Sequence, residues 1–310
     1  MSKSPRVIPS PAAITSSPSE MRTPMNPDST PLRIVEVGPR DGLQSLDARY
    51  SVETRLEWIG KLAQAGIQEI ECGAFVRNDL VPAMANCDQL FQSLGATPFR
   101  KWALVPNRRG MESALTSGAD ALAFFTSATE EFSQKNTACS REESIDRFRE
   151  IVKDSADLPL RAYISCCFEC PYEGLVDPRE VITMSLRLLD AGAREIVISD
   201  TIGSANAQQM GPLIDQLSDH LPLSSVALHL HDTHGHALEC ARVAWEHGIR
   251  TFDASAGGLG GCPFAPGASG NVSTEALVNL FQGMGIDTGI DTKGLAETQA
   301  WFSVQKTSDL

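Results

Sequence analysis

The sequence is short of positive charge. It holds 26 Lys and Arg residues against 39 Asp and Glu, which gives a formal net charge of -13 at pH 7. Nucleic acids and anionic membranes are bound through clustered Lys and Arg side chains. The composition therefore argues against both as partners, and any anionic ligand needs a local positive site.

Membrane and secretion signals are also missing. No apolar run reaches the roughly 18 residues that a membrane-spanning helix needs, and no charged segment followed by an apolar one indicates secretion. We therefore expect a cytoplasmic protein. The eight cysteines are then expected to be reduced thiols rather than a disulfide framework.

Residues 1–30 lack any sustained apolar period. They contain six prolines and seven serines, a composition that cannot bury enough surface to offset the entropy of ordering. We predict a disordered tail. A mitochondrial transit peptide is an alternative with little support, because three basic and two acidic residues leave the tail a net charge of only +1.

Beyond the tail, short β-rich runs alternate with longer amphipathic ones. Their apolar patterns predict eight strands, at residues 33–37, 67–72, 101–105, 121–126, 160–166, 195–199, 226–231 and 251–255. Helical patterns separate many of them, at residues 52–65, 111–117, 142–154, 178–191, 207–220 and 237–247.

Four of these helical stretches end alike. Each is closed by a glycine directly before an apolar run: Gly66, Gly118, Gly192 and Gly248. A left-handed glycine at a helix end, followed by a buried strand, produces this pattern. Eight βα units in about 280 residues predict a single (β/α)8 TIM-barrel domain over residues 31–310, with an extra C-terminal helix. An open doubly wound sheet is the rival, but no GxGxxG or Walker A motif supports its nucleotide-binding forms.

In a barrel, catalytic groups lie at the carboxyl ends of the strands and in the loops that follow. After the first predicted strand the chain reads GPRDGLQ at residues 38–44, so Arg40 and Asp41 place adjacent opposite charges at the mouth. Taken alone, this segment favours a turn with a surface ion pair.

The seventh predicted strand reads VALHLH. His229 and His231 point to one face, because side chains alternate along a strand. Two imidazoles so placed can bind one metal ion, whereas a lone core histidine is usually structural. His234 and His236 lie past the strand, where a polar loop or helix start is expected.

A glycine-rich stretch, AGGLGGCPFAPGASGN at residues 256–271, follows the eighth predicted strand. So much glycine costs stability, and a functional site is the usual reason to tolerate it. We interpret it as a mobile cover that brings Cys262 over the mouth, with a surface linker as the alternative. Asn271 offers an amide oxygen that suits a hard cation if it faces the mouth.

Two acids end other predicted strands. Glu71 and Asp200 can each hold an arginine or histidine in position, and a helix N-cap is the alternative for Asp200.

The mouth thus offers a mixed set of carboxylate, imidazole and amide donors: Asp41, His229, His231 and Asn271. Such a set suits a six-coordinate divalent metal, Mg or Mn, and suits a closed tetrahedral zinc site poorly.

Six segments together resemble the 3-hydroxy-3-methylglutaryl-CoA lyases: VEVGPRDGLQ, KNTACSREES, CPYEG, SDTIG, HLHDTHGHA and GGLGGCPFAPGASGN. These enzymes belong to a wider group of metal-dependent TIM-barrel lyases and acyl-CoA condensing enzymes that begin with an R-D-G-x-Q loop. The resemblance runs from about Leu32 to Ile290, and the glycine loop with its cysteine is typical of the lyase branch.

The resemblance implies cleavage of a 3-hydroxy-3-methylglutaryl-CoA type thioester to acetyl-CoA and a keto acid such as acetoacetate. The donor set above would hold the divalent metal. Arg40 would neutralise the charge that develops on the thioester, and Cys262 would move a proton. Glu71 would orient Arg40, and Asp200 would support the site. The implied catalytic residues are Arg40, Asp41, Glu71, Asp200, His229 and Cys262.

The resemblance also implies contacts around these groups. Glu275 would brace Asn271 from behind. The substrate-binding residues would be Arg40, Gln44, Asn136 and Tyr163. The family further implies an acyl-CoA thioester as the partner and a homodimer as the assembly.

The chain departs from the family in loops around the acyl chain and CoA. Residues 72–79 read CGAFVRND where lyases usually read T-x-S-F-V-S-P-K. The reaction class is therefore better defined than the substrate, which could be a longer or differently branched thioester. The alternatives are an aldolase or condensing enzyme of the same barrel group and a metal-dependent hydrolase. The hydrolase leaves Arg40 and Cys262 without a role.

Overall fold

The structure is a computed structural model that describes residues 31–46, 48–155, 157–261 and 270–308. The predicted tail at residues 1–30 and the predicted catalytic residue Cys262 lie outside the described residues. Within the described ranges, no helix is long and apolar enough to cross a membrane.

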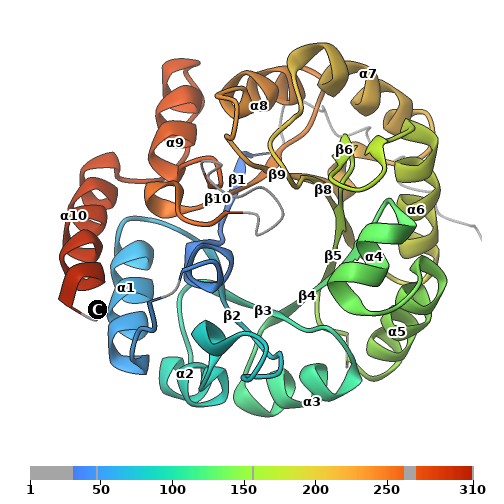
Figure 1. The fold of residues 1–310 in the computed structure, drawn as a ribbon. Coiled ribbons are helices and arrows are strands. Elements are labelled where there is room, and N and C mark those ends of the chain that lie inside the picture. Colours follow the sequence, from blue (N-terminus) through green and yellow to red (C-terminus); the bar gives the residue numbers. More distant parts are fainter. Residues whose placement is uncertain (1–30, 47, 156, 262–269, 309–310) are drawn as a thin grey trace, which may run out of the picture. The chain divides into compact units, whose positions relative to one another are not determined.

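Eight parallel strands close into a barrel in the order β1-β10-β9-β8-β5-β4-β3-β2. Figure 1 shows these strands as a central ring with the helices outside it. The strands are β1 (Arg33–Glu36), β2 (Glu69–Ala74), β3 (Arg100–Leu104), β4 (Ala121–Ser127), β5 (Leu160–Ser165), β8 (Glu195–Asp200), β9 (Val226–Leu230) and β10 (Thr251–Ala254). The first strand pairs with both β2 and β10. The predicted TIM barrel is therefore confirmed, and the open sheet is wrong.

Helices cover the outside of this ring. They are α1 (Val52–Gln64), α2 (Cys87–Leu94), α3 (Arg108–Ser117), α4 (Glu130–Thr137), α5 (Arg141–Asp154), α6 (Pro178–Asp190), α7 (Ala207–Ser218), α8 (Ala237–Glu246), α9 (Thr274–Gly283) and α10 (Thr292–Ser308). A small hairpin of β6 (Glu169–Cys170) and β7 (Gly174–Leu175) stands apart from the barrel sheet.

The predicted glycine stops have the expected backbone. The φ angles of Gly66, Gly118, Gly192 and Gly248 are +101°, +90°, +111° and +104°. Only glycine adopts such angles at little cost. Each glycine follows a helix and turns the chain toward the next buried strand. The same left-handed glycine turn therefore occurs at four of the helix-to-strand connections.

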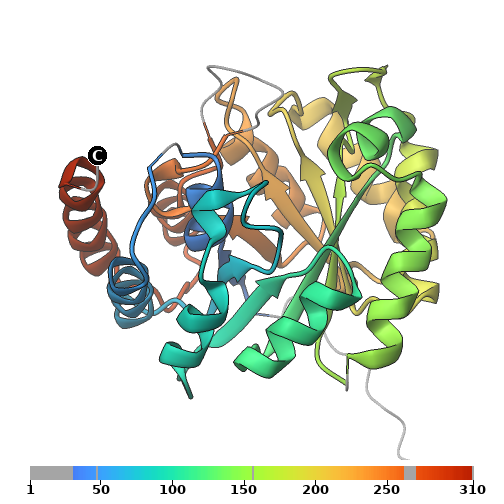
Figure 2. The ribbon, with the colours of Figure 1, turned by 60° about the horizontal axis from the view of Figure 1, so that its bottom comes forward.

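The extra C-terminal helix, α10, packs beside α1, as Figures 1 and 2 both show. Trp58 of α1 is fully buried and stacks on Phe302 of α10, with 4.0 Å between ring centroids. This contact joins α10 to α1, and Trp58 also lies beside Gly38 of the segment that follows β1.

Candidate active site

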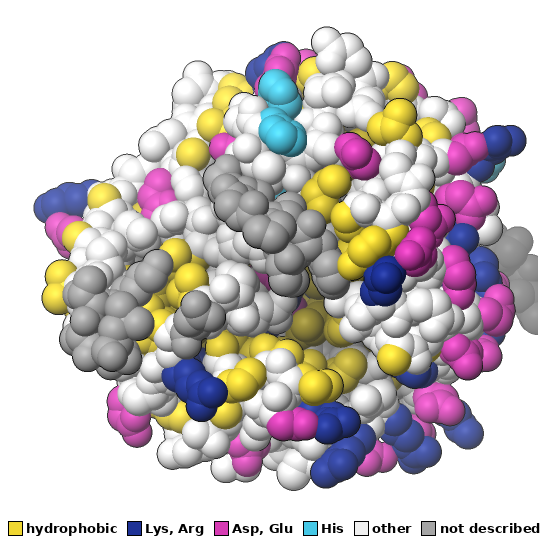
Figure 3. Space-filling model, in the orientation of Figure 1, with side chains coloured by type: hydrophobic (Ala, Val, Ile, Leu, Met, Phe, Trp, Pro, Cys, Tyr) yellow, Lys and Arg dark blue, Asp and Glu magenta, His cyan; other side chains and the backbone are white. Residues whose placement is uncertain are grey.

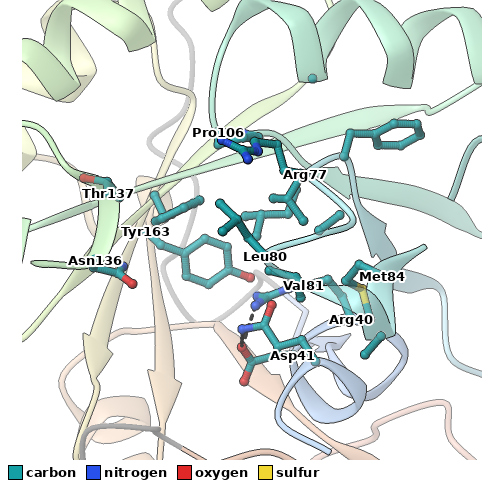
Figure 4. A pocket seen from close by; sticks show the side chains of 18 of the residues that line it. Arg40, Asp41, Arg77, Leu80, Val81, Met84, Pro106, Asn136, Thr137 and Tyr163 are labelled. Carbon is teal, nitrogen blue, oxygen red and sulfur yellow. Dashed lines mark hydrogen bonds and ion pairs between the residues drawn. The ribbon is translucent and has the colours of Figure 1, made fainter. Parts of the chain in front are cut away.

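A cavity of about 1870 Å³ opens at the carboxyl ends of the strands. Its wall includes Arg40, Asp41, Gln44, Asn136, Tyr163, His229 and His231. Figure 3 shows a hollow in the middle of this face with hydrophobic side chains along its edge. In Figure 4, Tyr163 projects across the cavity toward Arg40, and Asn136 lies on another side. The structure thus brings all the predicted substrate contacts to one cavity.

A π-helical turn, η2 (Gly38–Gly42), carries the first pair of charges. The backbone N–H groups of Arg40, Asp41 and Gly42 all point to the carbonyl oxygen of Val37, at 3.1, 2.7 and 3.2 Å. Gly38 fits here because a Cβ on it would come within 2.6 Å of Glu36 Oε1. This tight turn directs both charged side chains into the mouth.

Arg40 is only 5% exposed. Its Nη1 donates to Asp41 Oδ1 at 2.5 Å, and its Nη2 donates to Glu71 Oε2 at 2.8 Å. The surface ion pair favoured for this segment in isolation is therefore wrong, because the pairing of β1 with β2 places Glu71 beside the turn. Although burial opposes it, the two carboxylates hold the pKa of Arg40 well above its ordinary value.

Asp41, His229 and His231 form the predicted cluster. Their ligand atoms all lie within 4.8 Å of one another. The two Nε2 atoms are 3.4 Å apart, and they lie 3.9 and 4.0 Å from Asp41 Oδ2. Burial is the largest influence on His231 and lowers its pKa to about 4. Although burial also opposes ionisation of Asp41, Arg40 holds the pKa of that carboxyl well below its ordinary value.

This donor chemistry fits a divalent cation. At neutral pH, His231 is uncharged and Asp41 is ionised. An imidazole nitrogen and a carboxylate oxygen are common ligands of such ions. Three donors at this spacing could therefore hold one metal ion, with His229 in β9 and His231 directly after it.

Asn271 reaches the cluster in an unexpected orientation. Its amide nitrogen donates to Asp41 Oδ2 at 2.8 Å and to the carbonyl oxygen of Leu259 at 2.9 Å. The prediction placed the amide oxygen as a ligand, but the nitrogen faces Asp41 because both neighbours are acceptors. Gln44 also donates to Asp41, with its Nε2 at 3.3 Å from Oδ1.

Two of the predicted supporting acids bind backbone instead of site side chains. Asp200 accepts from the N–H groups of Ser204 and Ala205, both at 3.0 Å, and thereby fixes the loop after β8. Burial raises the pKa of Asp200 to about 6. Glu275 accepts from the N–H of Gly257 at 2.9 Å. The expected brace from Glu275 to Asn271 is replaced by this contact, since Glu275 lies in the first turn of α9.

Two buried charged residues were not predicted from the sequence, the acid Asp253 and the arginine Arg161. Asp253 of β10 accepts from His229, Tyr163 and Arg161, and all four side chains are buried. A signal was present, because an aspartate stands within the apolar run of the eighth predicted strand. Burial of such a group without a partner is costly, so a partner inside the barrel was to be expected.

Glu36 is a second buried acid that was missed. Its oxygens accept from the N–H groups of Gly38 and Ala256, at 2.8 and 2.9 Å, and from the hydroxyl of Thr274 at 2.6 Å. Burial raises its pKa to about 7. Glu36 therefore ties the η2 turn to the loop that follows β10.

The fold and the site define a TIM-barrel enzyme with a candidate metal cluster at its mouth. Residues 31–301 match the model of the HMGL-like family. Hydroxymethylglutaryl-CoA lyase of Pseudomonas mevalonii is 41% identical over 277 residues, which cover 88% of this chain and 92% of that protein. The cytoplasmic 3-hydroxy-3-methylglutaryl-CoA lyase of Mus musculus is 39% identical over 283 residues, or 90% of this chain and 82% of that protein.

Solved structures agree with these relatives. The HMG-CoA lyase of Brucella melitensis superposes with a TM-score of 0.86 at 38% identity, covering 89% of this chain and 99% of that one. An HMG-CoA lyase of Acinetobacter baumannii, solved with coenzyme A and 3-methylmalate, also has a TM-score of 0.86 at 32% identity, with coverage of 89% and 92%. The chain belongs to the 3-hydroxy-3-methylglutaryl-CoA lyase family.

Proposed function

We propose that this protein is a carbon–carbon lyase that cleaves a 3-hydroxy-3-methylglutaryl-CoA type thioester to acetyl-CoA and a keto acid, with acetoacetate as the product from the parent substrate. The observation that carries the proposal is the buried Arg40 directly beside the Asp41, His229 and His231 cluster inside one large cavity. Relatives of about 40% identity over most of the chain are named for this activity.

Asp41, His229 and His231 are the proposed ligands of a divalent metal, Mg or Mn, with the amide oxygen of Asn271 as a fourth. A bound ion would supply positive charge that lowers the pKa of the substrate hydroxyl beside the carbon–carbon bond to be cleaved. The contact of Asn271 Nδ2 with Asp41 Oδ2 at 2.8 Å supports this proposal, because the amide oxygen is carried by the same group beside the cluster.

Arg40 is the proposed stabiliser of the acetyl-CoA enolate. Cleavage moves an electron pair onto the thioester, and a fixed guanidinium in a buried site lowers the energy of that charge. Glu71 Oε2 accepts from the guanidinium at 2.8 Å. The Tyr163 hydroxyl lies 3.1 Å from the same oxygen, while its shorter contact, at 2.8 Å, is with Asp253 Oδ2. Arg40 is therefore oriented before the substrate binds.

The remaining roles follow the sequence prediction. Cys262 is proposed to deliver a proton to the acetyl-CoA carbon. Gln44, Asn136 and Tyr163 are proposed to contact the substrate, and Asp200 supports the site through the loop after β8. Glu275 acts through the backbone of Gly257.

We further propose one barrel domain over residues 31–310, a homodimer, and no nucleic-acid or membrane partner. A cytoplasmic location is proposed as well. Among the relatives, the mouse protein is named as cytoplasmic and a human one as mitochondrial, so fractionation of the source cells tests this point directly.

The test is a panel of 3-hydroxyacyl-CoA thioesters, incubated with protein loaded with Mg²⁺ or Mn²⁺ and analysed by mass spectrometry. The expected result is acetyl-CoA plus the keto acid of each accepted substrate, with loss of product in EDTA and recovery on adding metal. Product formation only from acetyl-CoA and a 2-keto acid identifies a condensing enzyme instead. Release of free CoA and the hydroxy acid identifies a hydrolase.

A pair of cysteine variants tests the proton donor. Cys262→Ala is expected to lower the rate of acetyl-CoA release, and Cys240→Ala, which changes a buried cysteine of α8, is the control. Full activity in Cys262→Ala contradicts the assigned role and leaves the lyase reaction itself standing.

A further inference from the structure

The interior of this barrel is charged, although barrel interiors are usually filled with branched apolar side chains. Arg161 of β5 and Asp253 of β10 are both fully buried there, and Arg161 Nη2 lies 2.9 Å from Asp253 Oδ1. The same Nη2 lies 3.1 Å from Glu195 Oε1 of β8. Taking these charges out of water is expensive, so they are retained for something beyond packing.

The carboxylate of Asp253 lies within hydrogen-bond distance of three donor side chains. Its Oδ1 faces Arg161, while its Oδ2 lies 2.8 Å from the hydroxyl of Tyr163 and 3.2 Å from Nδ1 of His229. Asp253 and His229 are register partners on the adjacent strands β10 and β9. The strand pairing itself therefore holds the carboxylate beside the imidazole.

This contact determines which nitrogen of His229 faces the cavity. A neutral imidazole has one N–H and one lone pair. Since Asp253 accepts at Nδ1, the proton belongs on Nδ1 and the lone pair on Nε2. That Nε2 is the atom 3.4 Å from His231 Nε2 and 3.9 Å from Asp41 Oδ2.

We propose that Asp253 is a positioning residue that fixes the ring and the tautomer of His229 for metal binding, and that Arg161 holds Asp253 in place from inside the barrel. The inference rests on the proposed metal site. Carboxylates that accept from the second nitrogen of a metal-binding histidine typically contribute ten- to a hundredfold to metal affinity.

Glu195 supplies a matched control. It contacts the same Arg161 nitrogen as Asp253 does, and it also pairs with Arg33 at 2.7 Å, where β8 and β1 begin. Glu195→Gln and Asp253→Asn make the same chemical change to one charge network. Only the second removes the carboxylate that contacts His229.

The experiment is calorimetric titration of the metal-free full chain with Mn²⁺ alone. Asp253→Asn is expected to raise the dissociation constant about ten- to a hundredfold, and Glu195→Gln about twofold at most. Affinity of Asp253→Asn within about twofold of the wild type overturns the proposal. An equal loss of Mn²⁺ affinity in both variants also overturns the proposal, because it shows that any disruption of the charge network weakens binding, whether or not the contact with His229 is removed.

A second measurement uses the unaltered sequence and does not depend on the folding of any variant. Nitrogen-15 NMR of the metal-free protein at about pH 8.5, above the ordinary histidine pKa, reports the tautomer of His229. The Nδ1–H form is expected, and the Nε2–H form overturns the proposal. If the wild type binds no Mn²⁺, the proposed metal site fails, while the tautomer still decides whether Asp253 orients His229.

Discussion

Replacing Glu36 with glutamine is expected to remove a loss of stability that this residue causes between pH 5 and pH 8. Glu36 is fully buried and its pKa is raised to about 7 from an ordinary 4.5. The folded protein then binds a proton that the unfolded chain has released. The free energy of unfolding therefore falls as pH rises through this window, and the stabilisation is fully present only below about pH 4.5.

The magnitude follows from the two pKa values. Linkage between 4.5 in the unfolded chain and about 7 in the fold gives a loss of about 2.5 kcal/mol from pH 5 to pH 8. Asp200, with its pKa raised to about 6, changes stability in the same direction at lower pH. His231, with its pKa lowered to about 4, changes it in the opposite direction. The difference between wild type and Glu36→Gln isolates the part that belongs to Glu36.

Glutamine can keep the local contacts. Its carbonyl oxygen can accept from Gly38 and Ala256, and its NH₂ group can donate to Thr274, whose hydroxyl reverses its role. The assay is urea unfolding followed by tryptophan fluorescence at pH 5, 6, 7 and 8. These pH values cover the range in which only the folded protein keeps Glu36 protonated, and they extend above its pKa of about 7. Parallel pH profiles for the two proteins contradict this prediction, because they show that Glu36 is ionised throughout.

Three further outcomes are expected. Arg40→Gln lowers kcat about a hundredfold or more, because glutamine carries no positive charge to stabilise the enolate. The control Arg187→Gln removes a surface ion pair with Glu142 and leaves kcat unchanged. A loss of kcat below about tenfold in Arg40→Gln contradicts its role. Trp58→Ala lowers the free energy of unfolding by about 3–5 kcal/mol through lost burial and stacking on Phe302, and an equal loss from the partly exposed Trp301→Ala contradicts this account. Gly66→Ala destabilises more than Gly118→Ala in the same urea assay, since both have positive φ but only the Gly66 Cβ meets a backbone oxygen, at 2.5 Å from Gly289; equal losses show that backbone strain alone matters.

Local patterns in the sequence predicted much of the barrel. The runs at 121–126, 195–199 and 226–231 correspond to β4, β8 and β9 within about one residue at each end. Helix α4 was not predicted, because its segment is mostly polar and buries little besides Phe132 and Ser133. A turn was predicted at residues 38–44, but not its π-helical form, since that conformation depends on packing against Glu36 and Ser255.

The site, too, has features that the sequence predicted and features that it did not. Alternation along one strand predicted that His229 and His231 share a face, and they lie 3.4 Å apart. Asp253 and Arg161 were missed, because their contact joins residues 92 positions apart. The orientation of the Asn271 amide depends on Asp41 and Leu259, which come from other segments of the mouth.

The sequence alone determined the βα repeat, the glycine stops, the histidine pair and the resemblance to a family. These features follow from periods of two and 3.6 residues and from short motifs, which neighbouring residues establish without the rest of the chain. Only the tertiary structure decided which side chains from different strands contact one another at the mouth. Closure pairs β1 with β10, more than 200 residues later, and thereby brings Arg40 and Asp41 near His229 and His231. The reason is that the first and last strands become neighbours only when the sheet closes into a ring.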